Sequence, residues 1–182
     1  MKQNEFLKEH WNFRFSHGGE LRKRRGGRKS RPLSRKDPIH LVFKMNIIAV
    51  PKGLRHPRNF RIIHEVVKRY GRRFFVRTDQ ISIQRDHIHL LVRSSRRHLY
   101  QHFFKVVAGQ IAQRVTRTPN HTYEGVRVWK YRPFTRVVKG WKAYKIIRNY
   151  IQLNELEAKG SIRYRKQRLK GLTADQIQSL WA

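Results

Sequence analysis

The sequence predicts an α+β fold in which helices flank an antiparallel sheet. Three observations carry this prediction: short runs typical of strands, longer segments with apolar residues at helical spacing, and one tight turn between two strand-like runs. Their order along the chain is strand, helix, strand, strand, helix, strand, helix. We expect the helices to cover one face of the sheet and the other face to be open.

The first part of the folded region supplies a strand and a helix. The strand begins at Ile39 in the run IHLVFKMNII, and Pro51 and Pro57 mark the loop that follows it. Apolar residues at helical spacing then predict a helix over residues 58–70. Gly71 is the expected end of this helix.

The next segments predict a hairpin and two more helices. FFVRTD and ISIQ are strand-like, and Arg85 and Asp86 make a tight turn into the strand HIHLLVR. A second helix begins near Arg96 and continues through LYQHFFKVVAGQIAQRV. VRVWK predicts a further short strand, and WKAYKIIRNYIQLNELEAKG predicts a third helix that ends at Gly160.

The composition points to a nucleic-acid partner. The 182 residues include 43 Lys and Arg but only 11 Asp and Glu, so the formal net charge is +32. Such a charge attracts polyanions and makes their binding depend steeply on salt.

The absence of cysteine excludes disulfides, thiolate metal sites and cysteine nucleophiles. No segment approaches the roughly 18 apolar residues of a membrane span, so we expect a cytoplasmic protein that does not contact membranes.

Composition also divides the chain into three parts. Residues 1–36 form a basic arm rich in Arg, Lys and Gly, residues 37–160 form the folded domain, and residues 161–182 form a basic tail. We expect the arm and the tail to grip nucleic acid; a disordered basic extension is the alternative for both.

Aromatic residues alternate with cations in WKYRPFTR, a pattern suited to stacking unpaired bases, although a strand core with exposed charges explains it nearly as well. Together, the arm and this segment supply the expected DNA-binding residues. These are Arg22, Lys23, Arg24, Arg25, Arg28, Lys29, Trp129 and Arg132.

His87 and His89 lie one residue apart in the second strand of the predicted hairpin. Because side chains alternate along a strand, both imidazoles point to one face. Two adjacent imidazoles can supply two ligands to a divalent cation and leave positions open for substrate. The alternative is ordinary surface histidines. The other eight histidines, including His40, show no pairing at ligand spacing and carry no such prediction.

The third predicted helix adds a tyrosine and an amide. Tyr150 and Asn154 are four residues apart and share the apolar face of the helix. A phenolate can attack a phosphodiester, and an amide oxygen can bind Mg²⁺. If this helix packs beside the histidine strand, Asn154 completes a metal site with the histidine pair, and Tyr150 faces the same metal. The alternative is a core tyrosine with its hydroxyl at the rim.

These motifs resemble a known family. DHIHLLV, PFTRVV and YIQLNELEAKG, within residues 17–160, are similar to the single-tyrosine HUH transposases and in particular to their REP-associated branch. The resemblance implies a ferredoxin-like or RRM-like fold. It also implies cleavage of single-stranded DNA near hairpins through a covalent 5′-phosphotyrosine, with Mg²⁺ or Mn²⁺. By this likeness the two histidines bind the metal and Tyr150 is the nucleophile. The third ligand is Asn154, with Glu157 as the alternative.

Two other functions fit the same sequence. A non-catalytic nucleic-acid-binding protein needs only the charge and the aromatic residues, and it predicts binding without cleavage or a covalent product. A domesticated nickase that acts on repeated palindromes has the same site residues as a transposase. The sequence is compatible with a monomer and with a homodimer.

Overall fold

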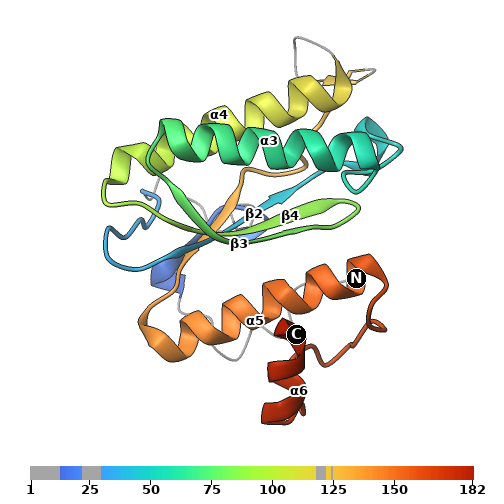
Figure 1. Ribbon diagram of the computed structural model, residues 1–182. Helices are drawn as coiled ribbons and strands as arrows, with labels where there is room; N and C mark the ends of the chain where they lie inside the picture. Colours follow the sequence, from blue (N-terminus) through green and yellow to red (C-terminus); the bar gives the residue numbers. More distant parts are fainter. Residues whose placement is uncertain (1–12, 22–29, 118–121, 124) are drawn as a thin grey trace.

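The computed structural model describes residues 13–21, 30–117, 122–123 and 125–182. Its centre is a five-stranded sheet in which every neighbouring pair of strands is antiparallel (Figure 1). In spatial order the strands are β1 (Ser16–His17), β7 (Phe134–Val137), β2 (Ile39–Lys44), β4 (His87–Arg93) and β3 (Arg77–Ile83). The predicted α+β class with an antiparallel sheet and flanking helices is confirmed.

Helices lie on both faces of the sheet. α3 (Pro57–Arg73) and α4 (Arg97–Thr116) cover one face, and α5 (Gly140–Lys159) lies across the other (Figure 1). The expectation of an open face was therefore wrong. The apolar stripe of α5 includes Ile147 and Ile151, which pack against Leu91 of β4, and burying this stripe removes apolar area from water.

The alternation of side chains along β2 and β4 separates two different environments. Ile88 and Leu90 of β4 and Phe43 of β2 are fully buried in the main core beneath α3 and α4. The intervening residues of the same strands point to the other face, toward α5. His87 and His89 therefore lie on the side of the sheet that α5 covers.

The fourth strand of the sheet differs from the prediction. In the VRVWK segment, only Val126–Arg127 (β6) is a strand, and it pairs with Thr122–Tyr123 (β5) outside the main sheet. β7 takes the place beside β2 instead. The sequence of β7, FTRV, contains Thr135 and Arg136, which hide the apolar pattern. Its strand character depends on pairing with distant residues.

Both ends of the described chain contact the folded domain. In the segment expected to be a basic arm, Ser16–His17 pairs with β7, and Arg31 donates hydrogen bonds to Thr135 and to the carbonyl of Pro133. Two short 3-10 helices, η1 (Phe13–Phe15) and η2 (Ile47–Ala49), flank β1 and β2.

The tail folds back beneath α5 through α6 (Ala174–Gln178) and η3 (Ser179–Trp181). Gln152 of α5 donates to the carbonyl of Leu180, and the indole of Trp181 donates to Asn149. Within the described ranges, no helix is long and apolar enough to cross a membrane.

Candidate active site

Helix α5 is held across the sheet by polar contacts with β3 and with the turn that follows it. The amide of Gln80 donates to Gln152 at 2.7 Å, and the amide of Gln84 donates to the carbonyl of Asn154 at 2.7 Å. The helix ends at Gly160, whose positive φ of 78° suits glycine and lets its N–H bond back to the last turn. These contacts hold α5 in a fixed position on the sheet, and so they position Tyr150 against the neighbouring strand β4.

The structure brings the histidine pair and the tyrosine together. The rings of His87 and His89 are 4.8 Å apart between centroids, and those of His89 and Tyr150 are 5.5 Å apart, both nearly perpendicular. His89 is fully buried and Tyr150 is 6% exposed. The His87 side chain is 22% exposed, so the group opens to solvent on the His87 side.

Each of the two histidines uses its Nδ1 atom in a hydrogen bond. The His87 Nδ1–H donates to Oδ1 of Asp86 at 2.6 Å, and this bond lowers the pKa of Asp86. Nδ1 of His89 lies 3.0 Å from Nε2 of His40 on β2. Metal-binding histidines commonly engage their second nitrogen in this way, so a metal bound by this pair would use the Nε2 atoms.

Burial keeps the inner histidines neutral. It lowers the pKa of His40 to about 3, with Arg136 adding to the effect, and it lowers the pKa of His89 well below its usual range. Neutral imidazole is the form that binds metal. His40 was among the histidines expected to be ordinary; its contact with His89 depends on β2 lying beside β4, so spacing along the chain gave no signal of it.

Burial raises the pKa of Tyr150 above its usual value. Arg168 and a hydrogen bond with Asn154 act in the opposite direction, and the Arg168 guanidinium lies 5.4 Å from the centre of the tyrosine ring. At neutral pH the phenol therefore carries its proton. Any attack by this oxygen requires the proton to leave as the bond forms.

Arg168 of the tail holds both residues considered for the third metal ligand. Its guanidinium pairs with Glu157 at 2.6 Å and donates to Oδ1 of Asn154 at 2.5 Å. Asn154 in turn donates to the backbone carbonyl of Tyr150 at 2.7 Å. Sequence reasoning missed Arg168, because one arginine in a run of basic residues has no distinguishing pattern.

The donor set fits a divalent cation. Two imidazoles and one amide or carboxylate oxygen make a mixed nitrogen and oxygen donor set, which suits a transition-metal ion such as Mn²⁺ better than Mg²⁺, since Mg²⁺ prefers oxygen ligands. Arg168 competes with a metal for the oxygens of Asn154 and Glu157, because its guanidinium already binds both side chains. With Arg168 in its observed position, the described part of the chain has no group of three or more His, Asp and Glu side chains placed to hold a metal.

Removal of the Arg168 side chain tests this competition. We expect Arg168→Ala to lower the free energy of unfolding by about 3 kcal/mol, because Glu157 keeps a buried charge without its partner. Mn²⁺ should recover part of this loss by taking the place of the guanidinium. Urea denaturation with and without Mn²⁺ measures both effects. Arg163→Ala, which removes an exposed arginine of the same tail, is the control; an equal response to Mn²⁺ in both variants would contradict the competition.

Of the residues expected to bind DNA, the structure describes Trp129 and Arg132. The side chain of Trp129 packs against Phe43 in the main core, and its indole donates to the carbonyl of Ala108 at 2.9 Å, on the opposite side of the sheet from Tyr150. Arg132 is exposed. The six expected cations of the arm are outside the described residues: Arg22, Lys23, Arg24, Arg25, Arg28 and Lys29.

Comparison with known proteins confirms the family resemblance. The profile of the family described as "Transposase IS200 like" matches residues 55–154, which include the histidine pair, Tyr150 and Asn154. A REP-associated tyrosine transposase bound to a REP hairpin has a similar structure, with a TM-score of 0.57 and 11% sequence identity, over 72% of this chain and 74% of that chain.

A candidate transposase from Deinococcus radiodurans R1 matches with a TM-score of 0.44 and 16% identity, over 71% of this chain and 98% of that chain. No curated protein matches the sequence. The first structure supports the fold, and the family profile extends over more than half of the 182 residues. The chain therefore belongs to the IS200-like transposase family.

Proposed function

We propose that this protein is a metal-dependent single-stranded DNA endonuclease and strand transferase with Tyr150 as its nucleophile. The observation that carries the proposal is the position of Tyr150, whose ring lies 5.5 Å from that of His89 on the face of β4 that holds the histidine pair. Membership of a transposase family supports a reaction on DNA.

In the proposed reaction, the oxygen of Tyr150 forms a bond to the phosphorus of a DNA phosphodiester, and the bond from phosphorus to the 3′ oxygen breaks. The tyrosine proton leaves to solvent, and the departing 3′ oxygen takes up a proton. The products are a free 3′ hydroxyl and a 5′-phosphotyrosine. Attack by another 3′ hydroxyl joins the strand and returns the proton to Tyr150.

The metal is proposed to be Mg²⁺ or Mn²⁺, held by His87 and His89 with Asn154 or Glu157 as the third ligand. A bound divalent cation supplies Lewis-acid polarisation of the scissile phosphate. The chain contributes the orientation of the ligands through Asp86 and the buried position of the phenol. Arg168, close to the tyrosine ring, favours the phenolate electrostatically.

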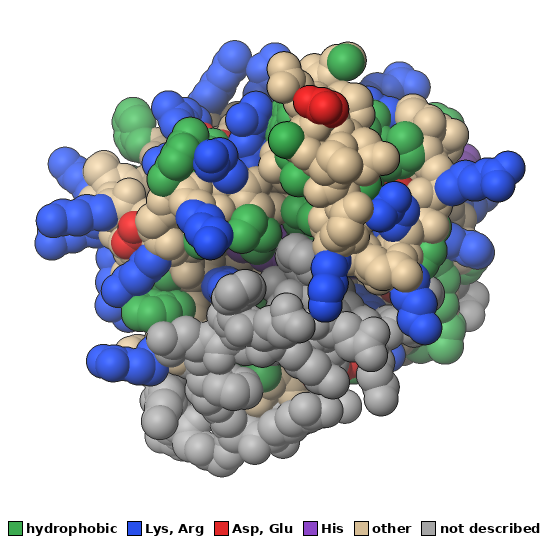
Figure 2. Space-filling model, turned by 90° about the horizontal axis from the view of Figure 1, so that it is seen from below, with side chains coloured by type: hydrophobic (Ala, Val, Ile, Leu, Met, Phe, Trp, Pro, Cys, Tyr) green, Lys and Arg blue, Asp and Glu red, His purple; other side chains and the backbone are tan. Residues whose placement is uncertain are grey.

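The proposed substrate is single-stranded DNA next to a hairpin, because the structurally similar REP-associated transposase is bound to a REP hairpin. Lys and Arg side chains are spread over the described part of the face that carries α5 and α6, where Asp and Glu are few (Figure 2). We retain residues 1–36 as a proposed contact with the hairpin or its flank.

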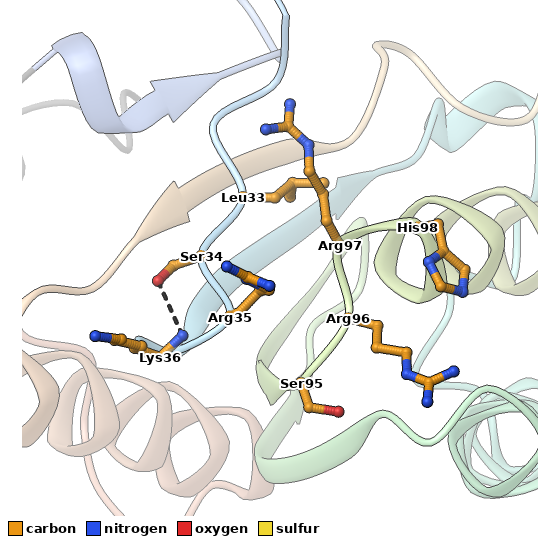
Figure 3. A pocket seen from close by; sticks show the side chains of 8 residues that line it. All are labelled: Leu33, Ser34, Arg35, Lys36, Ser95, Arg96, Arg97 and His98. Atoms are coloured by element: carbon orange, nitrogen blue, oxygen red, sulfur yellow. Dashed lines mark hydrogen bonds between the residues drawn. The ribbon is translucent and has the colours of Figure 1, made fainter.

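A basic pocket provides further positive charge at the other end of β4. It lies where residues 33–36 pass the start of α4, and its lining includes the exposed cations Arg35, Lys36, Arg96 and Arg97 (Figure 3). The pocket is separated from the histidine pair by most of the length of β4. We therefore expect this pocket to bind phosphate groups of the DNA that lie far from the cleavage site.

Aromatic residues of α5 are better placed than Trp129 to stack unpaired bases. The ring of Trp141 is 65% exposed and stacks on Tyr144 at 5.2 Å, on the same helix as the nucleophile. Lys145 lies 5.8 Å from the Trp141 ring, and Arg93 lies 4.8 Å from the Tyr144 ring. Exposed aromatic rings among cations suit single-stranded DNA.

Trp141→Ala is expected to weaken binding of single-stranded DNA about 5- to 150-fold, since stacking contributes about 1–3 kcal/mol per base. Trp141→Phe should retain most of the affinity. Fluorescence anisotropy with single-stranded and duplex oligonucleotides measures the change, and duplex binding should stay the same in all three proteins. An equal loss for duplex would mean that the residue acts through charge or folding.

The proposed function is tested with the purified protein and labelled single-stranded hairpins from its own genomic neighbourhood, with and without Mn²⁺. A denaturing gel should show a covalent protein–DNA adduct that requires metal. Tight binding without adduct or cut product, over several hairpins and both metals, would contradict the proposal and favour a non-catalytic binding protein.

A further inference from the structure

His40 is a fully buried histidine in β2 that faces α5. Its Nε2 atom lies 3.0 Å from Nδ1 of His89, and the two rings are nearly parallel, with an interplanar angle of 14°. The other nitrogen of His40, Nδ1, is buried and has no hydrogen-bond partner among the described residues. A buried polar atom without a hydrogen-bond partner destabilises the folded state, so a histidine at this position lowers the stability of the protein.

Among the residues that the structure describes, no anionic group acts on His40 in a way that would favour an imidazolium. The ring faces Tyr150 of α5 and Phe134 of β7, each 6.4 Å away, and His89 of β4. The charged group that acts on it from β7 is Arg136, a cation. The hydrogen bond between His40 and His89 is therefore a bond between two neutral rings.

Two neutral rings can share this bond in two ways. If His89 donates from Nδ1–H, then its Nε2 carries a lone pair and can bind a metal, and His40 accepts at Nε2. If His40 donates from Nε2–H, then the proton of His89 is on Nε2, which cannot bind a metal. The direction of one hydrogen bond thus decides whether His89 is a ligand.

We infer that His40 is a positioning residue that accepts the Nδ1–H of His89 and so presents Nε2 of His89 to the metal. The inference rests on the proposed function, because it requires the histidine pair to be a metal site. Asp86 accepts a hydrogen bond from Nδ1 of His87 in the same way, at the more exposed end of the histidine pair. At the buried end a neutral acceptor orients the ligand without the desolvation cost of a second carboxylate.

The test compares the full chain with its His40→Leu and His40→Gln variants in the absence of DNA. We expect ¹⁵N NMR to show His89 of the metal-free wild-type protein with its proton on Nδ1. Calorimetry should show that His40→Leu raises the dissociation constant for Mn²⁺ about 10- to 100-fold. His40→Gln should restore much of the affinity, because its side-chain oxygen can accept from the same N–H.

Leu91→Val is the matched control. Leu91 is the register partner of His40 on β4 and is buried in the same contact with α5, but its side chain forms no hydrogen bond. This variant should lose thermal stability without a change in Mn²⁺ affinity.

The outcomes separate the inference from the proposed function. Equal Mn²⁺ affinity in the wild-type protein and His40→Leu would overturn the role of His40 and leave the metal site standing. A proton on Nε2 of His89 in the metal-free wild-type protein would also overturn it, whether or not the variants fold. A wild-type protein that binds neither Mn²⁺ nor Mg²⁺ would overturn both.

Discussion

Tyr150→Phe is expected to abolish DNA cleavage and the covalent adduct, with a loss of at least about 10⁴-fold in rate, as for other enzymes that lose their nucleophile. The variant removes one oxygen atom from a ring that packs among the buried residues between α5 and the sheet and against His89. Because the ring remains, the fold and the affinity for hairpin DNA should change little. A denaturing gel measures cleavage and adduct, and fluorescence anisotropy measures hairpin binding.

Tyr144→Phe is the matched control, because Tyr144 lies on the same helix and also loses only a hydroxyl. Its cleavage activity should be retained. Undiminished cleavage by Tyr150→Phe, or an adduct that disappears in Tyr144→Phe instead, would place the nucleophile elsewhere.

His87→Ala is expected to reduce metal-dependent cleavage by about 10²- to 10³-fold, because a divalent cation would lose one of its two imidazole ligands. His87 is preferable to His89 for this test. Its side chain is 22% exposed, whereas His89 is fully buried, so its removal leaves a smaller cavity. The rate is measured as a function of Mn²⁺ concentration, from limiting to saturating metal.

His98→Ala, which removes an exposed histidine at the start of α4, is the comparison for this experiment. It should show the same dependence on Mn²⁺ as the wild-type protein. Activity of His87→Ala that is unchanged at limiting metal would exclude His87 as a ligand.

The competition at Arg168 connects these two experiments. The guanidinium lies beside the nucleophile and also holds the oxygen of Asn154. If Tyr150 is the nucleophile and Asn154 is a metal ligand, Arg168 favours the phenolate of Tyr150 and opposes the binding of metal at the third ligand position. Cleavage by Arg168→Ala should therefore need less Mn²⁺ for half-saturation but have a lower rate at saturating metal.

Local patterns in the sequence determined the parts of this protein that depend on one strand or one helix. The period of two in HIHLLVR places His87 and His89 on one face of a strand, and the observed strand β4 covers this same segment. The period of 3.6 places Tyr150 and Asn154 on one face of α5, which ends before Gly160 as predicted. The charge of +32 predicts a polyanionic partner without any knowledge of the fold.

Pairing over long separations in the chain was decided only by the tertiary structure. β7 lies between β1 and β2 in the sheet because it pairs with both, although Thr135 and Arg136 interrupt its apolar pattern. Trp129, expected to stack on DNA bases, is partly buried and packs against the main core, a contact that no nearby residue predicts. A local sequence window contains only one of the two partners of such a contact.

The composition of the site has the same division. The histidine pair, Tyr150 and Asn154 follow from the sequence, because each pair lies within five residues and shares a periodic face. His40 and Arg168 do not, since their contacts join β2 to β4 and the tail to α5. Their positions depend on how α5 and the tail pack on the sheet, and burial between those elements gives these two ordinary-looking residues their influence on the site.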